Sequence, residues 1–143
     1  MHNAIDITTR LASLLDAADH DQAAQLLAPD CVYDFRGSAM QGRDTIMASY
    51  DAAHADAVKT FDEVGYDSAV RADPDDDASA IIRYGDILSK GGVTHRHECE
   101  QRITIDRESG LVTRIQHIDL PGERDKLNAF LVSVGLPARP KLN

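Results

Sequence analysis

The sequence has little positive charge, no long apolar run and only two cysteines. Its 143 residues include 15 Lys and Arg against 24 Asp and Glu, which gives a formal net charge of -9. Proteins that bind nucleic acids or anionic membranes carry clusters of Lys and Arg, so this balance argues against both kinds of partner. No apolar stretch approaches the roughly 20 residues of a membrane-spanning helix, and the N-terminus has neither the basic region nor the apolar core of a signal peptide.

The scarcity of cysteine bears on the cellular compartment. Cys31 and Cys99 are the two cysteines, and their separation does not match the short spacing of a metal-binding pair. A reduced, cytoplasmic protein without a cofactor is therefore expected. The length predicts one domain over residues 1–143, with room for a sizeable core but not for two.

Apolar spacing and turn residues predict a group of helices followed by an antiparallel sheet. Helices are expected at residues 4–18, from the cap Asp19 to about residue 28, and at residues 43–54, with a brief strand at residues 31–36. Longer strands are expected at residues 59–72, 78–89, 93–106 and 111–120, and a last helix from Pro121 to about residue 135. Helices grouped ahead of such a meander indicate an α+β fold. The sheet can curl around the helices and enclose a cavity.

The strand expected at residues 93–106 differs from an ordinary core strand. Alternate side chains of a strand point to opposite faces, and the even positions here are all charged or hydroxylated. The odd positions form a face that is apolar at both ends and polar in the middle: Val93, His95, His97, Cys99, Gln101, Ile103 and Ile105. A core strand would have Val or Ile at the central positions, because each buried polar group needs a partner. We interpret this face as the wall of a ligand pocket.

Three local patterns resemble one known superfamily. They are Leu27-Ala28-Pro29-Asp30-Cys31-Val32-Tyr33-Asp34 before and in the first strand, Gly42-Arg43-Asp44-Thr45-Ile46 at the third helix, and residues 110–119 in the closing strand. With the order of elements, they resemble the nuclear transport factor 2-like superfamily, in its SnoaL-like and ketosteroid-isomerase-like branch. The resemblance implies a single SnoaL-like domain over residues 1–143, with a cone-shaped curved antiparallel sheet wrapped around N-terminal helices and a C-terminal helix. The superfamily mixes several enzyme classes with non-catalytic modules, so the fold alone does not choose an activity.

The resemblance implies a role for one carboxylate. Asp34 matches the position at which ketosteroid-isomerase-like members place their general base, at the pocket mouth; the alternative is a surface aspartate near a turn. A carboxylate whose pKa is raised in a partly apolar site can accept a proton. That pattern also needs a tyrosine in the first helix and an acid on a later strand, where this chain has leucines and Cys99 or Gln101. Ketosteroid isomerisation itself is therefore not expected.

His97 and His117 form the predicted catalytic pair. They fall on adjacent antiparallel strands and can share one concave face, and imidazole is suited to moving protons near neutral pH. Dehydratase-like members of the superfamily use a histidine pair with a carboxylate, which here would be Asp16 or Asp34. The alternative is that these histidines fill space and hydrogen-bond to neighbouring groups.

A metal site is another possible use of such histidines. His95 and His97 share one face, as metal-binding His-x-His pairs do, and Glu100 and His117 would complete a ligand set. Glu98 and Glu100 fall on the opposite face of the strand, so we expect no metal.

Other side chains are predicted to contact the ligand: Asp16, Tyr50, Tyr84, His95, Cys99 and Gln101. Among them, Tyr84 and Gln101 are expected to bind the oxygen atoms of the ligand. Cys99 would act as a nucleophile only if a nearby cation lowered its pKa, since buried cysteines are usually inert.

Two functions are compatible with these residues. The first is a cofactor-independent isomerase, dehydratase or cyclase, or an epoxide-hydrolase-like enzyme, that acts by general acid-base catalysis on an apolar oxygenated metabolite. The second is a non-catalytic ligand-binding or dimerisation module. A homodimer is expected through the sheet, where Arg96, Glu98, Glu100 and Arg102 can form contacts of matched charge across a two-fold axis.

Overall fold

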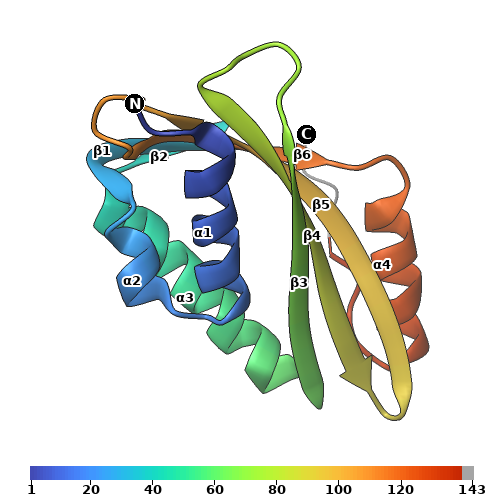
Figure 1. Ribbon diagram of the computed structural model, residues 1–143. Helices are drawn as coiled ribbons and strands as arrows, with labels where there is room; N and C mark the ends of the chain where they lie inside the picture. The colour runs from blue at the N-terminus through green and yellow to red at the C-terminus, as the bar shows by residue number, and fades with distance from the viewer. Residues whose placement is uncertain (140–143) are drawn as a thin grey trace.

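Six strands form one sheet in the order β2-β1-β6-β5-β4-β3 in the computed structural model, which describes residues 1–139 (Figure 1). The helices are α1 (Ala4–Asp16), α2 (His20–Ala24), α3 (Arg43–Thr60) and α4 (Glu123–Ser133). The strands are β1 (Leu27–Phe35), β2 (Ser38–Gln41), β3 (Glu63–Ala72), β4 (Ser79–Lys90), β5 (Val93–Ile105) and β6 (Val112–Asp119). Figure 1 shows α1, α2 and α3 grouped on one side of the long strands, with α4 beside β5. The predicted α+β class is confirmed.

The strand pairing confirms the predicted meander and adds two features that the sequence pattern did not predict. Strands β3, β4, β5 and β6 pair antiparallel in chain order. Strand β1 pairs in parallel with β6, and the short strand β2 turns back antiparallel onto β1, where a loop was expected. Because β6 ends the meander with a free edge, β1 completes the sheet there and carries its side chains to the same concave face.

Several element boundaries differ from the prediction. Asp19 caps α2 as expected, with its carboxylate accepting from the Gln22 N–H at 3.3 Å. The helix nevertheless ends at Ala24, and Leu27 is a fully buried residue that begins β1. Helix α3 continues to Thr60, six residues beyond its predicted end, so β3 begins at Glu63 rather than near residue 59. The alanines at positions 52, 53, 55 and 57 have high helix propensity, which favours this extension.

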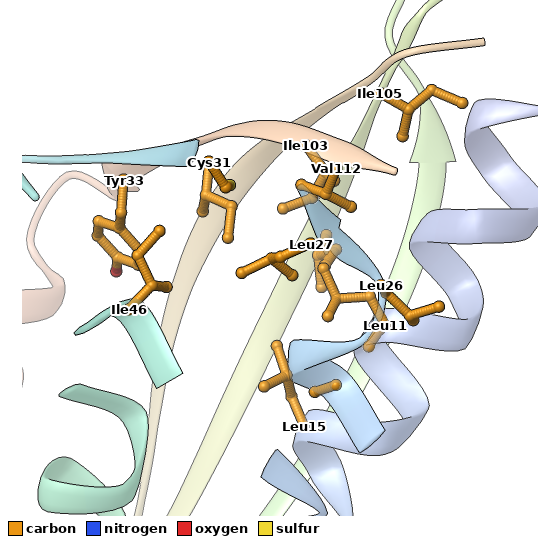
Figure 2. Packing of buried hydrophobic residues seen from close by; sticks show 14 of the residues in the cluster. Leu11, Leu15, Leu26, Leu27, Cys31, Tyr33, Ile46, Ile103, Ile105 and Val112 are labelled. Carbon is orange, nitrogen blue, oxygen red and sulfur yellow. The ribbon is translucent and has the colours of Figure 1, made fainter. Parts of the chain in front are cut away.

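One apolar cluster joins α1 to the sheet at one end of the concave face. Figure 2 shows Leu11 and Leu15 of α1 with Leu26, Leu27 and Ile103, and Leu11, Leu27 and Ile103 are completely buried. Truncation of a buried leucine to alanine in such a cluster costs about 2 to 5 kcal/mol. This cluster therefore fixes α1 against the sheet.

A second apolar cluster forms around α4. Leu127 and Phe130 of α4 pack with Phe61 and Leu88, and Phe61 lies just after the end of α3. Leu15 from the first cluster and Phe61 and Leu88 from the second line the same cavity. The two clusters thus form the ends of one cavity on the concave face.

The convex face of the sheet carries ion pairs that join β5 to β4 and, across β4, to β3 and the residue after it. The even residues of β5 lie on this face, as predicted, and each has a partner within the chain. The pairs are Arg96 with Asp67 (2.6 Å), Glu98 with Arg83 (2.7 Å), Glu100 with Arg71 (2.6 Å) and Arg102 with Asp73 (2.9 Å). Gly85 lies under the Arg96–Asp67 pair, where any larger side chain would collide with the guanidinium group. None of the described helices is both long and apolar enough to cross a membrane.

Candidate functional site

A cavity of about 440 Å³ lies on the concave face of the sheet. Its aromatic lining comes from α3, β1, β3 and β4 and from the residue after α3: Tyr50, Tyr33, Phe35, Tyr66, Tyr84 and Phe61. Its ionisable lining comprises Asp16, His20, His54, Asp56, Asp86, Cys99, His117 and Arg139. The volume and the mixture of apolar walls with a few polar groups are typical of small-molecule sites.

Most of the residues predicted from the sequence to face a ligand do line this cavity. They are Asp16, Tyr50, Tyr84, Cys99, Gln101 and His117. The other predicted residues, Asp34, His95 and His97, lie outside its lining. The odd face of β5 is therefore a cavity wall over only part of its length.

Asp34 points to the convex face of the sheet. Its carboxylate accepts a hydrogen bond from the Arg114 guanidinium at 2.7 Å. Strand β1 alternates, so the neighbouring residues Tyr33 and Phe35 line the cavity instead. The structure thus does not bring Asp34 to the pocket mouth, where the resemblance had implied it.

His95 and His97 face the concave side but lie beyond the cavity. The His95 ring stacks on Phe130 of α4 at 5.1 Å between ring centres. His97 lies directly opposite Asp86 in the β4–β5 pairing. Burial lowers the pKa of both imidazoles, which favours their neutral forms. Helix α4 covers this end of β5, and the sequence pattern gave no sign of that packing.

The structure does not bring His97 and His117 together as a pair. His117 lies opposite Gln101 in the β5–β6 pairing. Four residues of β5 separate Gln101 from His97, which is about 13 Å along an extended strand. The two imidazoles share a face, as predicted, but only His117 lines the cavity.

His117 has one nitrogen held by a carboxylate and one nitrogen without a partner. Its Nε2 lies 2.9 Å from Oδ1 of Asp119. Its Nδ1 is buried and makes no hydrogen bond within residues 1–139. Burial lowers the pKa of His117 despite the nearby carboxylate, so the ring is neutral at physiological pH. Since a carboxylate only accepts, Nε2 carries the proton and Nδ1 presents a lone pair.

Arg36 fixes the carboxylate that holds His117. Its guanidinium donates two hydrogen bonds to Asp119, from Nε to Oδ2 at 2.6 Å and from Nη2 to Oδ1 at 2.7 Å. This pairing holds the pKa of Asp119 far below its usual value, so the carboxylate stays ionised. The Phe35 ring lies between these groups, 4.8 Å from the centre of the His117 ring and 4.6 Å from the guanidinium carbon of Arg36. Arg36, Asp119 and His117 thus form an ordered chain that ends at the cavity wall.

A second chain of hydrogen bonds ends at the Tyr33 hydroxyl. The Tyr50 hydroxyl donates to Oε1 of Gln101 at 3.0 Å, and Nε2 of Gln101 donates to the Tyr33 hydroxyl at 3.0 Å. Burial raises the pKa of Tyr33, so the hydroxyl keeps its proton. A hydroxyl that already accepts a hydrogen bond is a stronger donor, because such chains are cooperative. Gln101 lies opposite His117, and both residues line the cavity with Tyr33, so this donor and His117 belong to one part of the cavity.

The other end of the cavity is acidic. Burial raises the pKa of Asp86 to about 6, and it also raises the pKa of Asp16. One oxygen of Asp16 accepts from the Ser68 hydroxyl at 2.5 Å, and Ser68 lies opposite Tyr84 in the β3–β4 pairing. Asp86 lies two residues after Tyr84 on the same strand, so alternation places both side chains on the cavity face.

Two further histidines line the cavity between α2, α3 and β3. His20 is hydrogen-bonded through Nδ1 to Asp51 of α3, and Nδ1 of His54 lies 2.8 Å from the Tyr66 hydroxyl. The two rings are 6.2 Å apart in an edge-on arrangement. His20 begins α2, which precedes the sheet in the sequence, so the alternation of strand residues did not indicate that it lines the cavity.

Among the described residues, the predicted side chains form neither a nucleophilic cysteine site nor a group of metal ligands. Burial raises the pKa of Cys99 to about 12, which leaves the thiol protonated and poorly nucleophilic. No group of three or more His, Cys, Asp or Glu side chains is placed to hold a metal ion within the described part of the chain. The site is an aromatic cavity with a few titratable and hydrogen-bonding groups.

Comparison with known families and structures agrees with the fold. The family model described as the SnoaL-like domain matches residues 2–113. No curated protein sequence matches this chain at a significant level.

Several solved structures share the arrangement of helices and strands. A candidate polyketide cyclase from Xanthomonas campestris pv. campestris is similar with a TM-score of 0.64 and 15% identity, covering 92% of this chain and 96% of that one. An NTF2-like protein of unknown function from Exiguobacterium sp. 255-15 has a TM-score of 0.63 and 12% identity, covering 80% and 98%. A candidate polyketide cyclase from Pseudomonas putida KT2440 has a TM-score of 0.61 and 14% identity, covering 86% and 96%. At these identities the likeness shows the fold alone, and it confirms the predicted nuclear transport factor 2-like fold.

Proposed function

Because the chain belongs to the SnoaL-like domain family, we propose that its concave cavity binds a small, largely apolar oxygenated metabolite in the cytoplasm and converts it by general acid-base catalysis. The reaction is an isomerisation, dehydration or cyclisation that needs no cofactor. One observation carries this proposal: the unpaired Nδ1 of His117 on the cavity wall, with its other nitrogen held by Asp119.

His117 is the proposed proton acceptor and donor. A neutral imidazole accepts a proton through its free lone pair, and Asp119 stabilises the imidazolium that forms. Arg36 keeps Asp119 ionised and fixed, so the ring does not need to reorient during proton transfer.

Tyr33 is the proposed donor to the developing oxyanion. The proposed step breaks a C–H bond next to a carbonyl group of the ligand. The proton moves to Nδ1 of His117, and the bonding electron pair delocalises onto the carbonyl oxygen, which accepts a hydrogen bond from Tyr33. Return of the proton from His117 to another carbon gives isomerisation. Return of the proton to a β-hydroxyl group, which then leaves as water, gives dehydration. Attack of the carbanion carbon on a second carbonyl, whose oxygen takes the proton, gives cyclisation.

The test begins with a thermal-shift screen of ketones, enols and phenols, followed by turnover assays on the chemotype that binds. His117→Gln retains an amide in place of the ring but cannot move a proton, so turnover should fall about 100- to 10,000-fold. Tyr33→Phe should lower turnover with little change in ligand affinity, because its hydrogen bond strengthens as charge develops. Unchanged turnover in His117→Gln would overturn the proposal.

Two further variants sharpen this test. His97→Gln tests the second histidine of the pair predicted from the sequence. A fall in turnover equal to that in His117→Gln would assign the chemistry to both histidines. Arg83→Gln removes a charge on the convex face and serves as the matched control for handling and folding. Circular dichroism of every variant shows whether the fold is retained.

A second candidate function is ligand binding without turnover. The hydrogen-bond chain of Tyr33, Gln101 and Tyr50 is satisfied largely within itself, and six aromatic side chains line the cavity, which favours a stable apolar binding site. A ligand that binds wild-type protein and is recovered unchanged would favour this function.

A homodimer through the convex face also remains a proposal. The charges there are already paired within the chain, so a second copy would have to share these ion pairs rather than complete them. Sedimentation equilibrium that shows only monomer at high protein concentration would contradict it.

A further inference from the structure

Asp16 and Asp86 place two carboxylates at the end of the cavity away from His117. Asp16 is the last residue of α1, and its contact with Ser68 places it over β3. Asp86 lies on β4, two residues beyond Tyr84, which is opposite Ser68. Asp16 and Asp86 both influence the ionisation of Tyr84, so the three side chains are close neighbours.

Polar atoms at this end of the cavity lack hydrogen-bond partners. Oδ1 of Asp16 and the Tyr84 hydroxyl are buried, and neither is hydrogen-bonded to any described residue. Both residues line the cavity. A buried polar atom without a partner is costly, so these atoms indicate a group that a ligand would supply.

The charge of the lining indicates the nature of that group. The described lining contains three aspartates, Asp16, Asp56 and Asp86, and Arg139 is its only Lys or Arg. The rings of Tyr66 and Tyr84 also line this part of the cavity, and aromatic faces attract cations. Ionised carboxylates in a partly apolar wall favour a cation over a neutral donor.

From these neighbours we infer that the Asp16–Asp86 end of the cavity is a binding site for a protonated amine carried by the ligand. The ligand class is then an apolar amine whose oxygen function lies at the His117 end. The ammonium group donates to Asp86 and to the free oxygen of Asp16, and Tyr84 contributes its hydroxyl oxygen and its ring. This inference rests on the proposed function only in placing the ligand in the same cavity.

Arg139 supplies a positive charge to the cavity lining. Its backbone is fixed to α4 by two hydrogen bonds with the Asn128 side chain, at 2.7 and 2.9 Å. Arg139 lines the cavity with Asp86, and its charge lowers the pKa of that carboxyl. The other arginine that acts on Asp86 is Arg96, which is bound to Asp67 on the convex face. A ligand ammonium group therefore competes with Arg139 for Asp86.

The test compares naphthylethylamine with naphthylethanol, two probes of equal shape that differ in charge. Isothermal titration calorimetry at about pH 8 keeps the carboxylates ionised and the amine protonated. Wild-type protein should bind the amine at least about tenfold more tightly than the alcohol. Asp86→Asn should remove this preference while retaining affinity for the alcohol, and Arg139→Gln should increase it. Asp16→Asn gives a second reading if Asp86→Asn does not fold.

Each outcome separates this inference from the proposed function. Equal affinity for the two probes in wild-type protein would overturn the amine site and leave the proposed reaction standing. A preference that survives both Asp86→Asn and Asp16→Asn would overturn it as well. A charge-dependent preference together with unchanged turnover in His117→Gln would support the amine site and overturn the catalytic proposal. Failure of both probes to bind would overturn the amine site for this ligand shape, while turnover of His117→Gln would still test the catalytic proposal by itself.

Discussion

The two faces of the sheet differ in how far their polar side chains are paired. On the convex face, Arg71, Arg83 and Arg96 each pair with a carboxylate of another strand. On the concave face, Nδ1 of His117 and the Tyr84 hydroxyl are buried and have no partner among residues 1–139. The same strands supply both faces, so strand propensity does not explain the difference.

This contrast locates the function of the molecule. Paired charges in water contribute little to stability but maintain solubility and register between strands. Unpaired polar atoms in a cavity reduce stability unless a ligand completes them. The concave face therefore carries a stability cost that binding of the proposed ligand would offset, and the predictions below test that asymmetry.

Among the three substitutions that compare the two faces, the largest effect is expected at the carboxylate that orients His117. Asp119→Asn removes the negative charge that stabilises imidazolium and holds the ring, so turnover should fall about 10- to 1,000-fold. The acidic limb of kcat/KM should lie below the ordinary imidazole value of 6.5 in wild-type protein, since burial lowers the pKa of His117. Because Asp119 raises that pKa, the variant should move the limb to still lower pH. A limb that moves upward would contradict the assignment.

Asp86 provides a stability test with a definite sign. Its pKa is about 6 in the folded protein against an ordinary value of 3.8, so ionisation destabilises the fold above about pH 6. Asp86→Asn cannot ionise, and it should stabilise the protein by about 2 to 3 kcal/mol near pH 7.5. At about pH 3 Asp86 is mostly protonated in both the folded and the unfolded state, so the difference should nearly vanish. Urea unfolding at the two pH values measures this, and a destabilised variant near pH 7.5 would refute the prediction.

Asp67→Asn is the matched substitution on the convex face and should have the smallest effect. Its pairing with Arg96 lowers the pKa of Asp67, so the ionised form stabilises the fold above the ordinary value. The pair is exposed and screened by salt, so the loss should be below about 1 kcal/mol. The same urea experiment measures it. Changes of opposite sign in the free energy of unfolding for Asp67→Asn and Asp86→Asn would confirm the difference between the faces. Changes of equal sign would contradict it.

Much of the fold was predictable because it depends on local patterns. Turn residues and period-two alternation gave the four-stranded meander, and Asp19 correctly marked the start of α2. The parallel pairing of β1 with β6 was not predictable, because it joins residues about 80 apart that share no local signal, such as Asp34 and Gln116. Helix α3 was predicted too short, because alanine-rich sequence extends the helix without an apolar stripe.

The site was predictable where side chains alternate and unpredictable where helices cover the sheet. Alternation correctly placed Cys99, Gln101 and His117 on the cavity wall. The same rule would have found Asp119, two residues after His117. Packing of α4 over the far end of β5 could not be inferred from β5 itself.

The central claim is that His117 presents an unprotonated Nδ1 to the cavity. Nitrogen-15 NMR of the imidazole rings tests it without knowledge of the substrate. Comparison of wild type with His117→Gln assigns the His117 signals among the six histidines. We predict a proton on Nε2, none on Nδ1, and a shift of the Nδ1 signal when naphthylethanol binds. A proton on Nδ1, or a ligand that binds without moving this signal, would contradict the account.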